Sequence, residues 1–552
     1  MNPREITDVK VLQDLVVELV NRVEELSLAL STSEEGLAAA QDEINRLKGE
    51  QGRPRFPRRK RSKLPKVKQR PSKPSSDSDP PPGDTDSCSP PEVDRCIVVD
   101  TPPVDLPADA VFKGYRKVYQ TDVLISRQNT EYQIARWYSA TCGKSYESSL
   151  PTGATAGIGS SLRSLIQVLH HGGDMTHRKI SELLTHLGIE LSSGTISNVL
   201  THNDWVESEY EQLLPTILTE SPYIQMDSTV SRQSGKGMHT QVLCGEFFSF
   251  FSTQPGRSRL DVYAALQGSS RQAVQLAYTP VAIERMKDAR VSKKHLAYFA
   301  KTFKLGAVFS VADLQTHFES ASVFTKTNRV RCSAIAGALA AGYYAQQDQV
   351  PRVGCLLTDD ASEYRKIAAQ VHLHCWVHAI RHYRKLSPTQ PYLRSIHQDF
   401  LDRLWNFYDR LRSYQKQPPD QQESNRQELI REFDQLFDPH TDYQQLNYQI
   451  ELTLQKRAFL LGCLQFPEVP LHNNAAERAA RRVVRKRNIS LHTWSQRGTR
   501  IRDAFMSLHQ TAKKLPISFL DYLKQRNAGE SPQWTIPQLV KMKYQTANST
   551  AF

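Results

Sequence analysis

The feature that most constrains the fold is a series of strand-like runs between residues 223 and 375, interrupted by helical segments. Ile224 and Met226 alternate with Gln225 and Asp227, which is the period of two that a β-strand requires. Two further strand-like runs, HTQVLCGE and FFSFFST, follow across a short turn, and RLDVYAALQG is predicted as a helix. This alternation of strands and helices predicts an α/β fold.

A fourth strand is predicted in the run RVGCLLTDD, which is mostly apolar from Val353 to Leu357. Short apolar runs of this kind are typical of a strand buried on both faces at the centre of a sheet. SEYRKIAAQ is then predicted as a helix and VHLHC as a fifth strand. This order of elements resembles a ribonuclease-H-like core, a mixed sheet in which the first and fourth strands and a later helix each carry an acidic residue.

Three acidic residues occupy the corresponding positions in this chain. Asp227 lies in the first strand, Asp359 ends the fourth, and Glu477 begins a basic helix. Three carboxylates converging at one edge of a sheet could hold two Mg²⁺ ions, because hard oxygen ligands suit Mg²⁺ and leave coordination sites for phosphate and water. Two ions about 3.5–4 Å apart stabilise the attacking and leaving oxygens of an in-line displacement.

Four segments resemble the catalytic domain of insertion-sequence-66-family transposases, a branch of the DDE transposases. They are MDSTV around Asp227, LLTDDASEYR around Asp359, HCWVHAIRHYRKL, and VPLHNNAAERAARRVVRKRNIS around Glu477. The resemblance covers most of residues 10–515, and it implies that these three acids form a catalytic triad holding two Mg²⁺ ions, which Mn²⁺ can replace. It also implies a DNA transposase that binds element ends, cleaves them and joins them to target DNA, with element-encoded helper proteins as further partners.

Each acid also has a simpler interpretation. Asn474 and Glu477 have the spacing of a helix capping box, with Asn474 at the N-cap and Glu477 three residues later. Asp359 could be a plain turn residue, and Asp227 could be an acid at the edge of a sheet. Asp360 also follows the fourth strand, so either aspartate could be the second metal ligand; we expect Asp359, the first after the strand.

Six cations follow Glu477 on the same predicted helix. They are Arg478, Arg481, Arg482, Arg485, Lys486 and Arg487. A charge run is usually a solvated face, but beside three carboxylates these residues are predicted to bind DNA phosphates. Trp494 could stack on a base, although such a tryptophan is more often part of a core.

A group of histidines and one cysteine raises the question of zinc. His374, Cys375, His378 and His382 lie near one another in the sequence, and residues four apart share a helix face. No second cluster completes four ligands, so we expect the group to be structural or to support the acids. The resembling family commonly has a zinc ribbon near residue 142, where this chain keeps only Cys142, so zinc is not expected.

A heptad pattern over residues 9–48 predicts an N-terminal coiled coil. One series is Val16, Val23, Leu30, Leu37 and Ile44, and the other is Leu12, Leu19, Leu26, Ser33, Ala40 and Leu47. Leucine at the early d positions and valine at the early a positions favour a parallel dimer. We therefore predict a homodimer or a higher oligomer; the alternative is a helix packed on its own domain.

A basic and then acidic linker is predicted at residues 49–95. Residues 51–74 contain eleven Lys or Arg and no Asp or Glu, and their five prolines prevent a stable helix. We expect a disordered arm that binds DNA phosphates without reading sequence. Its candidate DNA-binding residues are Arg58, Arg59, Lys60 and Arg61. Residues 75–95 are acidic and rich in proline.

The rest of the chain completes the predicted domain organisation. A small β-rich module is expected at 96–160, and a helix-turn-helix module at 161–205, with Ser192 or Ser193 capping its last helix. The predicted catalytic core comprises 220–388 with an insertion near 270–345, an all-helical insertion at 389–465, the helix of Glu477 with the end of the core at 466–515, and a C-terminal tail at 516–552.

The net charge of +13 favours a polyanionic partner such as DNA. No apolar run reaches about 18 residues and no signal pattern begins the chain, so we expect no contact with membranes and a cytoplasmic, nucleoid-associated location in a prokaryote. Two other functions stay open: a catalytically inactive DNA-binding regulator derived from a transposase, and a metal-dependent nuclease that cuts without joining.

Overall fold

A computed structural model describes two parts of the chain. They are residues 9–47 and, from residue 93 onward, all except 94, 100, 102–109, 111, 113, 124, 152, 153, 155, 551 and 552. The predicted basic arm, with Arg58, Arg59, Lys60 and Arg61, lies outside the described residues. The chain divides into two compact units, Met1–Ser31 with Asn129–Phe552, and Thr32–Gln128. In the second unit the described residues are the end of one helix and segments without regular secondary structure.

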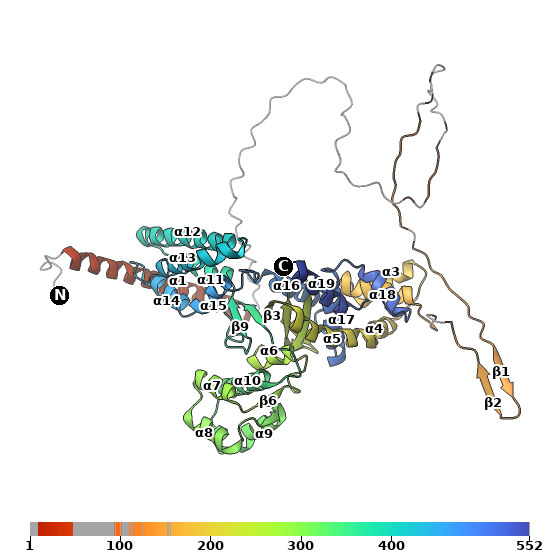
Figure 1. Ribbon diagram of the computed structural model, residues 1–552, viewed down its shortest axis with the longest axis horizontal. Helices are drawn as coiled ribbons and strands as arrows, with labels where there is room; N and C mark the ends of the chain where they lie inside the picture. The colour runs from red at the N-terminus through yellow and green to blue at the C-terminus, as the bar shows by residue number, and fades with distance from the viewer. Residues whose placement is uncertain are drawn as a thin grey trace. The chain divides into compact units, whose positions relative to one another are not determined.

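A five-stranded mixed sheet forms the centre of the first unit (Figure 1). Its strands are β3 (Ile224–Gln233), β4 (Lys236–Cys244), β5 (Ser249–Gln254), β8 (Cys355–Thr358) and β9 (Val371–His374). Their order across the sheet is β5-β4-β3-β8-β9; the first three are antiparallel, whereas β8 and β9 run parallel to β3. All five strands lie where the sequence predicted them, and the α/β class is confirmed.

The turn between β3 and β4 fixes the pairing of the two longest strands. Gln233 pairs with Lys236, so the loop contains only Ser234 and Gly235. Both loop residues have positive φ, at 47° and 76°. Two such residues are typical of a type I′ turn, whose twist matches that of the flanking strands. The pairing then continues in register to Gln225 and Cys244.

The connection from β8 to β9 differs from the prediction. Residues 361–370 form turns and not the helix predicted for SEYRKIAAQ. Tyr364 is buried in the core, and the backbone N–H of Ala368 donates to the hydroxyl of Tyr263 at 2.9 Å. Between them, Lys366 has a φ of 61°. Because a residue in the left-handed region interrupts an α-helix, the segment follows the surface of the core instead.

Helix α17 (Gln496–Ala512) runs along the outer edge of β5. Three of its polar side chains, spaced four residues apart, accept hydrogen bonds from backbone N–H groups of the strand. The bonds are Thr253 N to Asp503 Oδ2 (2.7 Å), Phe251 N to Ser507 Oγ (3.0 Å) and Ser249 N to Thr511 Oγ1 (3.1 Å). The helix thereby satisfies an edge that would otherwise be open to pairing with another chain.

The C-terminal residues belong to the core, so the prediction of a tail at 516–552 is wrong. Helices α18 (Phe519–Asn527) and α19 (Ile536–Thr550) pack near α5 (Asp204–Glu220), the helix that precedes β3. The hydroxyl of Tyr522 donates to the buried carboxylate of Glu209 at 2.6 Å. The segment is short and polar overall, but most of its large apolar side chains are buried in the core, among them Phe519, Leu523 and Val540.

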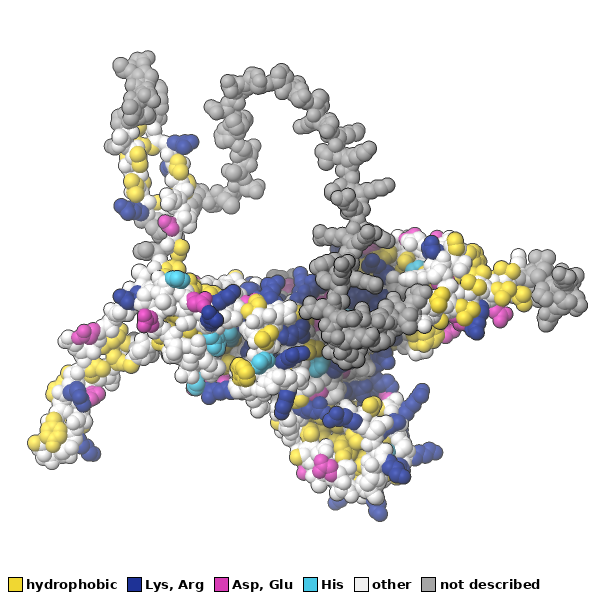
Figure 2. Space-filling view, turned by 180° about the vertical axis from the view of Figure 1, so that it is seen from behind, with side chains coloured by type: hydrophobic (Ala, Val, Ile, Leu, Met, Phe, Trp, Pro, Cys, Tyr) yellow, Lys and Arg dark blue, Asp and Glu magenta, His cyan; other side chains and the backbone are white. Residues whose placement is uncertain are grey.

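The insertion predicted near 270–345 lies between helix α6 (Arg259–Leu266) and β8. It consists of β6 (Gln275–Ala277), α7 (Pro280–Asp288), α8 (Lys293–Thr302), β7 (Val308–Ser310), α9 (Val311–Ser320), η3 (Ser322–Phe324) and α10 (Arg329–Gln346). Residues 270–345 hold eleven Lys or Arg and four Asp or Glu, so they carry 11 − 4 = +7 of the chain's net +13. Figure 2 shows these cations around the lower lobe of the molecule.

A second insertion is all helical, as predicted, and separates β9 from helix α16 (Asn474–Ser490). It consists of α11 (Trp376–Arg384), α12 (Pro391–Tyr414), α13 (Pro419–Leu436), α14 (Gln444–Leu454), α15 (Arg457–Leu461) and η4 (Gly462–Leu464). These helices have a core of their own around Trp376, Phe407 and Phe433.

The N-terminal helix α1 (Val9–Leu47) lies beside the helical insertion (Figure 1) and binds it through polar side chains. Glu24, which is 1% exposed, accepts hydrogen bonds from the backbone N–H groups of Thr389 and Gln390, at 2.8 and 3.3 Å, where α12 begins. Asn21 accepts from the backbone N–H of Gln444 at 2.9 Å, where α14 begins. One face of the predicted coiled-coil helix is therefore packed on its own chain.

A small helical module precedes the sheet. It contains α2 (Ser160–Gln167), the π-helical turn η2 (Val168–Gly172), α3 (His177–His186) and α4 (Ser193–Thr201), around a core of Ile166, Ile180, Leu184, Ile196, Val199 and Leu200. Ser192 is the cap of α4, since its hydroxyl accepts from Thr195 N at 3.1 Å. Upstream, the described part of the predicted β-rich module forms one hairpin, β1 (Arg136–Ser139) with β2 (Lys144–Glu147). Among the described helices, none has the length and hydrophobicity of a membrane span.

Candidate active site

Two of the three predicted acids lie side by side on neighbouring strands of the sheet. Asp227 is the fourth residue of β3, and Asp359 directly follows β8. The parallel register pairs Gln225 with Leu357, so each acid lies two residues further along its own strand. Paired positions of neighbouring strands face the same side of a sheet, and the register therefore brings both carboxylates to one face.

Helix α16 is fixed to this part of the sheet by hydrogen bonds at its first turn. The side-chain amide of Asn473 donates to the carbonyl of Met226 at 2.7 Å. The side-chain oxygen of Gln225 accepts from Ala475 N at 3.1 Å, so a strand residue satisfies a free N–H of the helix. These contacts place Glu477, one turn into α16, next to Asp227.

The capping-box interpretation of Glu477 does not hold. The N-cap of α16 is Asn473, not Asn474, and neither residue makes a side-chain capping bond. Glu477 is therefore one residue too far along the helix to complete the box. Its Oε1 atom is buried without a hydrogen-bond partner, and Nε2 of His378 lies 3.7 Å from it. The carboxylate is thus available for another role.

Burial raises the pKa of both Asp227 and Asp359, and neighbouring carboxylates add to this effect. Burial, together with the negative charges of Asp359 and Glu477, raises the pKa of Asp227 to about 6. Burial also raises the pKa of Asp359, which the backbone N–H of Ala361 and the imidazole of His378 oppose. A carboxyl group whose pKa is raised by burial and by neighbouring carboxylates is typical of functional sites, and Asp227 is poised to share a cation with its neighbours.

The structure distinguishes Asp359 from Asp360. The charge of Asp359 acts on Asp227, whereas Asp360 forms ion pairs with Lys456 and, at 3.4 Å, with Arg365. A carboxylate already neutralised by two cations is a poor ligand for a further cation. Asp359 is therefore the member of the pair that faces the other acids.

The donor chemistry suits Mg²⁺, but the acids are not arranged as a finished metal site. Within the described residues, no three His, Cys, Asp or Glu side chains are grouped so that they could hold an ion. Asp227, Asp359 and Glu477 offer only carboxylate oxygens, which are the ligands that Mg²⁺ prefers. An ion would have to draw the three groups together, and the unpartnered Oε1 of Glu477 is free to move toward it.

Two further residues belong to this cluster: Glu363, which the sequence analysis did not single out, and His378, which it expected to be structural or to support the acids. Glu363 is buried, and its negative charge contributes to the raised pKa of both Asp227 and Asp359. Its position four residues after Asp359, within LLTDDASEYR, was the available signal. His378 lies on α11 between Asp359 and Glu477, whereas His374 stacks on Phe459 at 4.7 Å and points elsewhere.

Three of the six predicted DNA-binding cations on α16 are exposed. Arg478, Arg481 and Arg485, spaced three and four apart, form one stripe along the helix, which we call the arginine stripe. Arg478 and Arg481 line a groove of about 350 Å³ that also reaches Glu477. A phosphate backbone lying on this stripe would pass beside the acids.

The other three cations make intramolecular contacts. Arg482 forms an ion pair with Asp174 at 2.6 Å, and Nζ of Lys486 donates to the carbonyl of His170 at 2.7 Å. For these two buried side chains the structure contradicts the predicted contact with DNA, because this face of α16 binds the helical module. Arg487, half-buried, donates to the carbonyl of Val230 at 2.6 Å.

Comparison with known proteins identifies one domain. Residues 316–501 match the family model for transposases of the IS66 family, which confirms the resemblance over that stretch. The match contains Asp359 and Glu477 but stops short of Asp227, so the place of Asp227 depends on the geometry of the sheet. The uncharacterised protein y4jO of Sinorhizobium fredii is 29% identical over 311 residues, which are 56% of this chain and 92% of that protein. No solved structure matches the chain.

Proposed function

We propose, from the premise that residues 316–501 carry an IS66-family transposase domain, that the chain is a DNA transposase that cleaves element ends and joins them to target DNA. The observation that carries this proposal is the meeting of Asp227 and Asp359 on neighbouring parallel strands, with Glu477 brought to them by α16. The strand order β5-β4-β3-β8-β9 supports a ribonuclease-H-like core, with the helical insertion entering before α16.

In this proposal Asp227, Asp359 and Glu477 hold Mg²⁺, with Mn²⁺ able to replace it. The bound metal would supply Lewis acidity toward the phosphate oxygens and the attacking water. The arginine stripe would hold the strand so that water attacks the phosphorus and the bond to the 3′ oxygen breaks. The released 3′-OH would then attack a target phosphorus, forming one phosphodiester bond as another breaks, with no bond to the protein.

Recognition of the element ends is proposed for the helical module. The helices α3 and α4, joined by a short turn at Gly188, have the succession of a helix-turn-helix, in which the second helix enters the major groove. Arg482 and Lys486 fasten this module to α16. Bases recognised by α4 would therefore be held at a fixed distance from the acids.

Self-association is proposed for α1. The apolar heptad side chains that the structure describes are exposed, while the polar residues Asn21 and Glu24 face the helical insertion. The exposed members are Val16, Leu19, Val23, Leu26 and Leu30. A second copy of the same helix is the occupant that this spacing fits.

A DNA-binding regulator without catalysis is the second candidate. It is favoured by the absence, among the described side chains, of acids already grouped as a metal site. Against it stands the buried carboxylate cluster, whose repulsion a structural role would not require.

Cleavage and strand transfer on labelled element-end DNA test the proposal, with Mg²⁺ or EDTA, for the wild type, Glu477→Gln and the control Glu530→Gln. Glu530 is exposed and distant in sequence from the acids. We expect metal-dependent joining by the wild type and the control, and binding without cleavage by Glu477→Gln. Wild-type cleavage by Glu477→Gln would exclude this triad. Binding without cleavage by every protein would favour the regulator, and cutting without joining would favour a nuclease.

A further inference from the structure

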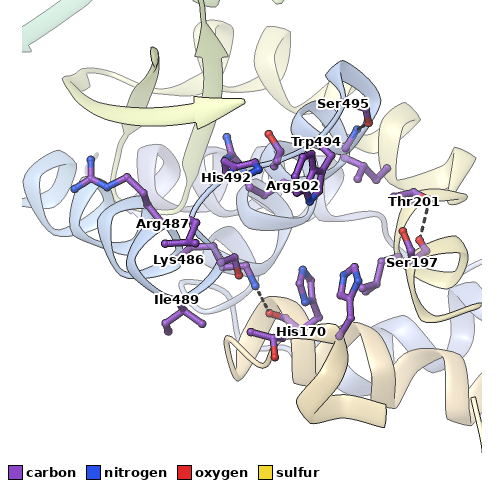
Figure 3. A pocket seen from close by; sticks show the side chains of 18 of the residues that line it. His170, Ser197, Thr201, Lys486, Arg487, Ile489, His492, Trp494, Ser495 and Arg502 are labelled. Atoms are coloured by element: carbon purple, nitrogen blue, oxygen red, sulfur yellow. Dashed lines mark hydrogen bonds between the residues drawn. The ribbon is translucent and has the colours of Figure 1, made fainter. Parts of the chain in front are cut away.

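A cavity of about 400 Å³ lies between the helical module, the end of α16 and residues 491–495, which join α16 to α17. One wall comes from η2 and α4, with His170, Ser197 and Thr201, and another from α16 and the joining segment (Figure 3). The end of β3 contributes Ser231 and Arg232. We call this cavity the Trp494 pocket, and the proposed function assigns it no task.

Trp494 gives the pocket an aromatic surface. Its side chain is 80% exposed, so it is not the core residue that a tryptophan usually is. Its indole ring touches the His492 ring edge to face, with 4.4 Å between the ring centres. Leu491, beside it in the sequence, is 66% exposed. An exposed apolar cluster at the mouth of a cavity marks a binding surface.

The backbone that carries Trp494 is held firmly. Ser234 donates through N to the carbonyl of Thr493 at 2.7 Å and through Oγ to the carbonyl of Trp494 at 2.5 Å. Leu491 has a φ of 59°, and His492 N bonds to the carbonyl of Ser490 at 2.7 Å, which closes a tight turn of three residues. A residue that has a β-carbon is strained in this left-handed conformation, and strained residues are concentrated at ligand sites. These backbone contacts hold the residue that carries the indole ring in place at the pocket.

Several buried polar atoms of the pocket have no partner within the protein. They are Oγ of Ser231, Oγ of Ser490, Nε2 of His492 and Nε2 of His171. A buried polar group without a hydrogen bond is costly, so four such groups on residues around one cavity favour a polar ligand or water toward which they can turn. Burial lowers the pKa of His170 to about 3, so this wall offers neutral imidazole rather than cations.

The pocket is aligned with the candidate active site along β3. Ser231 is four residues from Asp227 and on the same face of the strand, about 13 Å away at ~3.3 Å per residue. That distance is about four nucleotide steps of ~3.4 Å. Arg232 follows Ser231 on β3, is exposed and also lines the pocket, where it can contact the phosphate of a nucleotide that enters.

We propose that the Trp494 pocket receives one unpaired base of the DNA strand that lies across the acids. The base stacks on Trp494, its polar edge bonds to the unpartnered hydroxyl and imidazole groups, and Arg232 contacts its phosphate. Four cations line the pocket, but Lys486, Arg487 and Arg502 donate to groups of the protein, whereas Arg232 is exposed. An aromatic ring, polar groups and an exposed cation together match a nucleotide within a strand better than a free anion. This inference rests on the proposed function, because only then does a DNA strand occupy this face of the sheet.

The test compares the full chain's binding to two labelled DNAs in EDTA, one fully paired and one with four unpaired nucleotides at the same end. Fluorescence anisotropy gives the two dissociation constants for the wild type, Trp494→Ala, Trp494→Phe and the control Trp534→Ala. Trp534 is also a partly exposed tryptophan, 43%, outside the pocket. We expect Trp494→Ala to weaken binding of the unpaired end about tenfold and binding of the duplex less than twofold. Trp494→Phe should retain most of the difference.

Arg232→Gln provides a second, independent readout. It should weaken binding to the unpaired end and reduce the slope of log K against log salt by about one. Equal losses on both DNAs, or no loss for Trp494→Ala, would overturn the proposal. So would competition by a free deoxynucleotide as strong as that by the unpaired end, which would identify a site for small nucleotides.

The two proposals fail separately. A chain that binds unpaired ends through Trp494 but never cleaves would refute the transposase and leave the pocket standing. A chain that cleaves and joins, and whose Trp494→Ala variant binds both DNAs normally, would refute the pocket alone.

Discussion

At the scale of single residues, adjacent aspartates have different surroundings, and this separates their expected roles. Asp359→Asn should lower metal-dependent cleavage at least about a hundredfold, because it removes a charged ligand from the cluster with Asp227. Asp360→Asn should cost less than about threefold, since it only loosens ion pairs with Lys456 and Arg365. Single-turnover cleavage of labelled ends measures both variants. The reverse ranking would make Asp360 the ligand.

The raised pKa of Asp227 predicts how stability depends on pH. Because the pKa is about 6 in the folded chain and near 3.8 when unfolded, the folded state binds more protons between these values. The free energy of unfolding therefore falls as pH rises through that window, by an order of 3 kcal/mol at most. Asp227→Asn should remove this loss, raising the melting temperature at pH 7.5 but not at pH 4.

Melting temperatures of the metal-free proteins across pH 4–8 measure this effect, with Asp348→Asn, an exposed aspartate, as the control. Adding Mg²⁺ should stabilise the wild type at pH 7.5 more than Asp227→Asn. If the control shows the same pH-dependent gain, the effect does not come from repulsion between the clustered acids.

The strands and the helix that carry the three predicted acids could be found from the sequence because these elements have strong local signals. The residues that support the acids could not be found in this way. Gln225 caps α16 from a neighbouring strand, and Glu363 reaches the cluster from a turn that was predicted as helix. Likewise, spacing allowed a capping box at Glu477, and only the position of the N-cap excluded it. Such contacts depend on which segments meet in space, which a local pattern does not encode.

At the scale of elements, the contact of α17 with β5 should contribute measurably to stability. Ser507→Ala removes the acceptor of Phe251 N and leaves a buried N–H group unsatisfied. The expected loss in free energy of unfolding is about 1–3 kcal/mol. Chemical denaturation measures it, with Ser424→Ala on an exposed face of α13 as the control, which should change stability by less than about 0.5 kcal/mol. Equal stability of the two variants would mean that the edge of β5 is satisfied in another way.

Elements with a regular period were predicted correctly, and elements set by tertiary contacts were not. The five strands alternate or form short apolar runs, so period and length identified them. The segment 361–370 has helical composition but is held in turns by Tyr364 and the bond to Tyr263. Helices α18 and α19 were missed because their few apolar residues become a core face only beside α5.

At the scale of the whole molecule, α1 contacts the helical insertion through one face and is proposed to self-associate through another. Glu24 and Asn21 cap the starts of α12 and α14, and these bonds fix which face of α1 points outward. The outward face carries Val16, Leu19, Val23, Leu26 and Leu30 of the heptad pattern, with Leu19 and Leu26 57% and 59% exposed. The structure shows that one face of this helix packs on its own chain, and we propose that the exposed face binds a second copy.

In the proposed transposase, joining both ends of an element requires two active sites at once. Loss of the dimer formed through this face should therefore affect joining separately from cleavage. Leu19→Glu with Leu26→Glu places charges on the exposed face and leaves the capping bonds of Glu24 intact. Sedimentation should show a monomer where the wild type is a dimer, at nearly unchanged melting temperature. The variant should bind single ends but lose joining of paired ends. As the control, Glu18→Gln, on an exposed position outside the two series, should remain dimeric. A double variant that still sediments as a dimer would place the subunit interface elsewhere in the molecule.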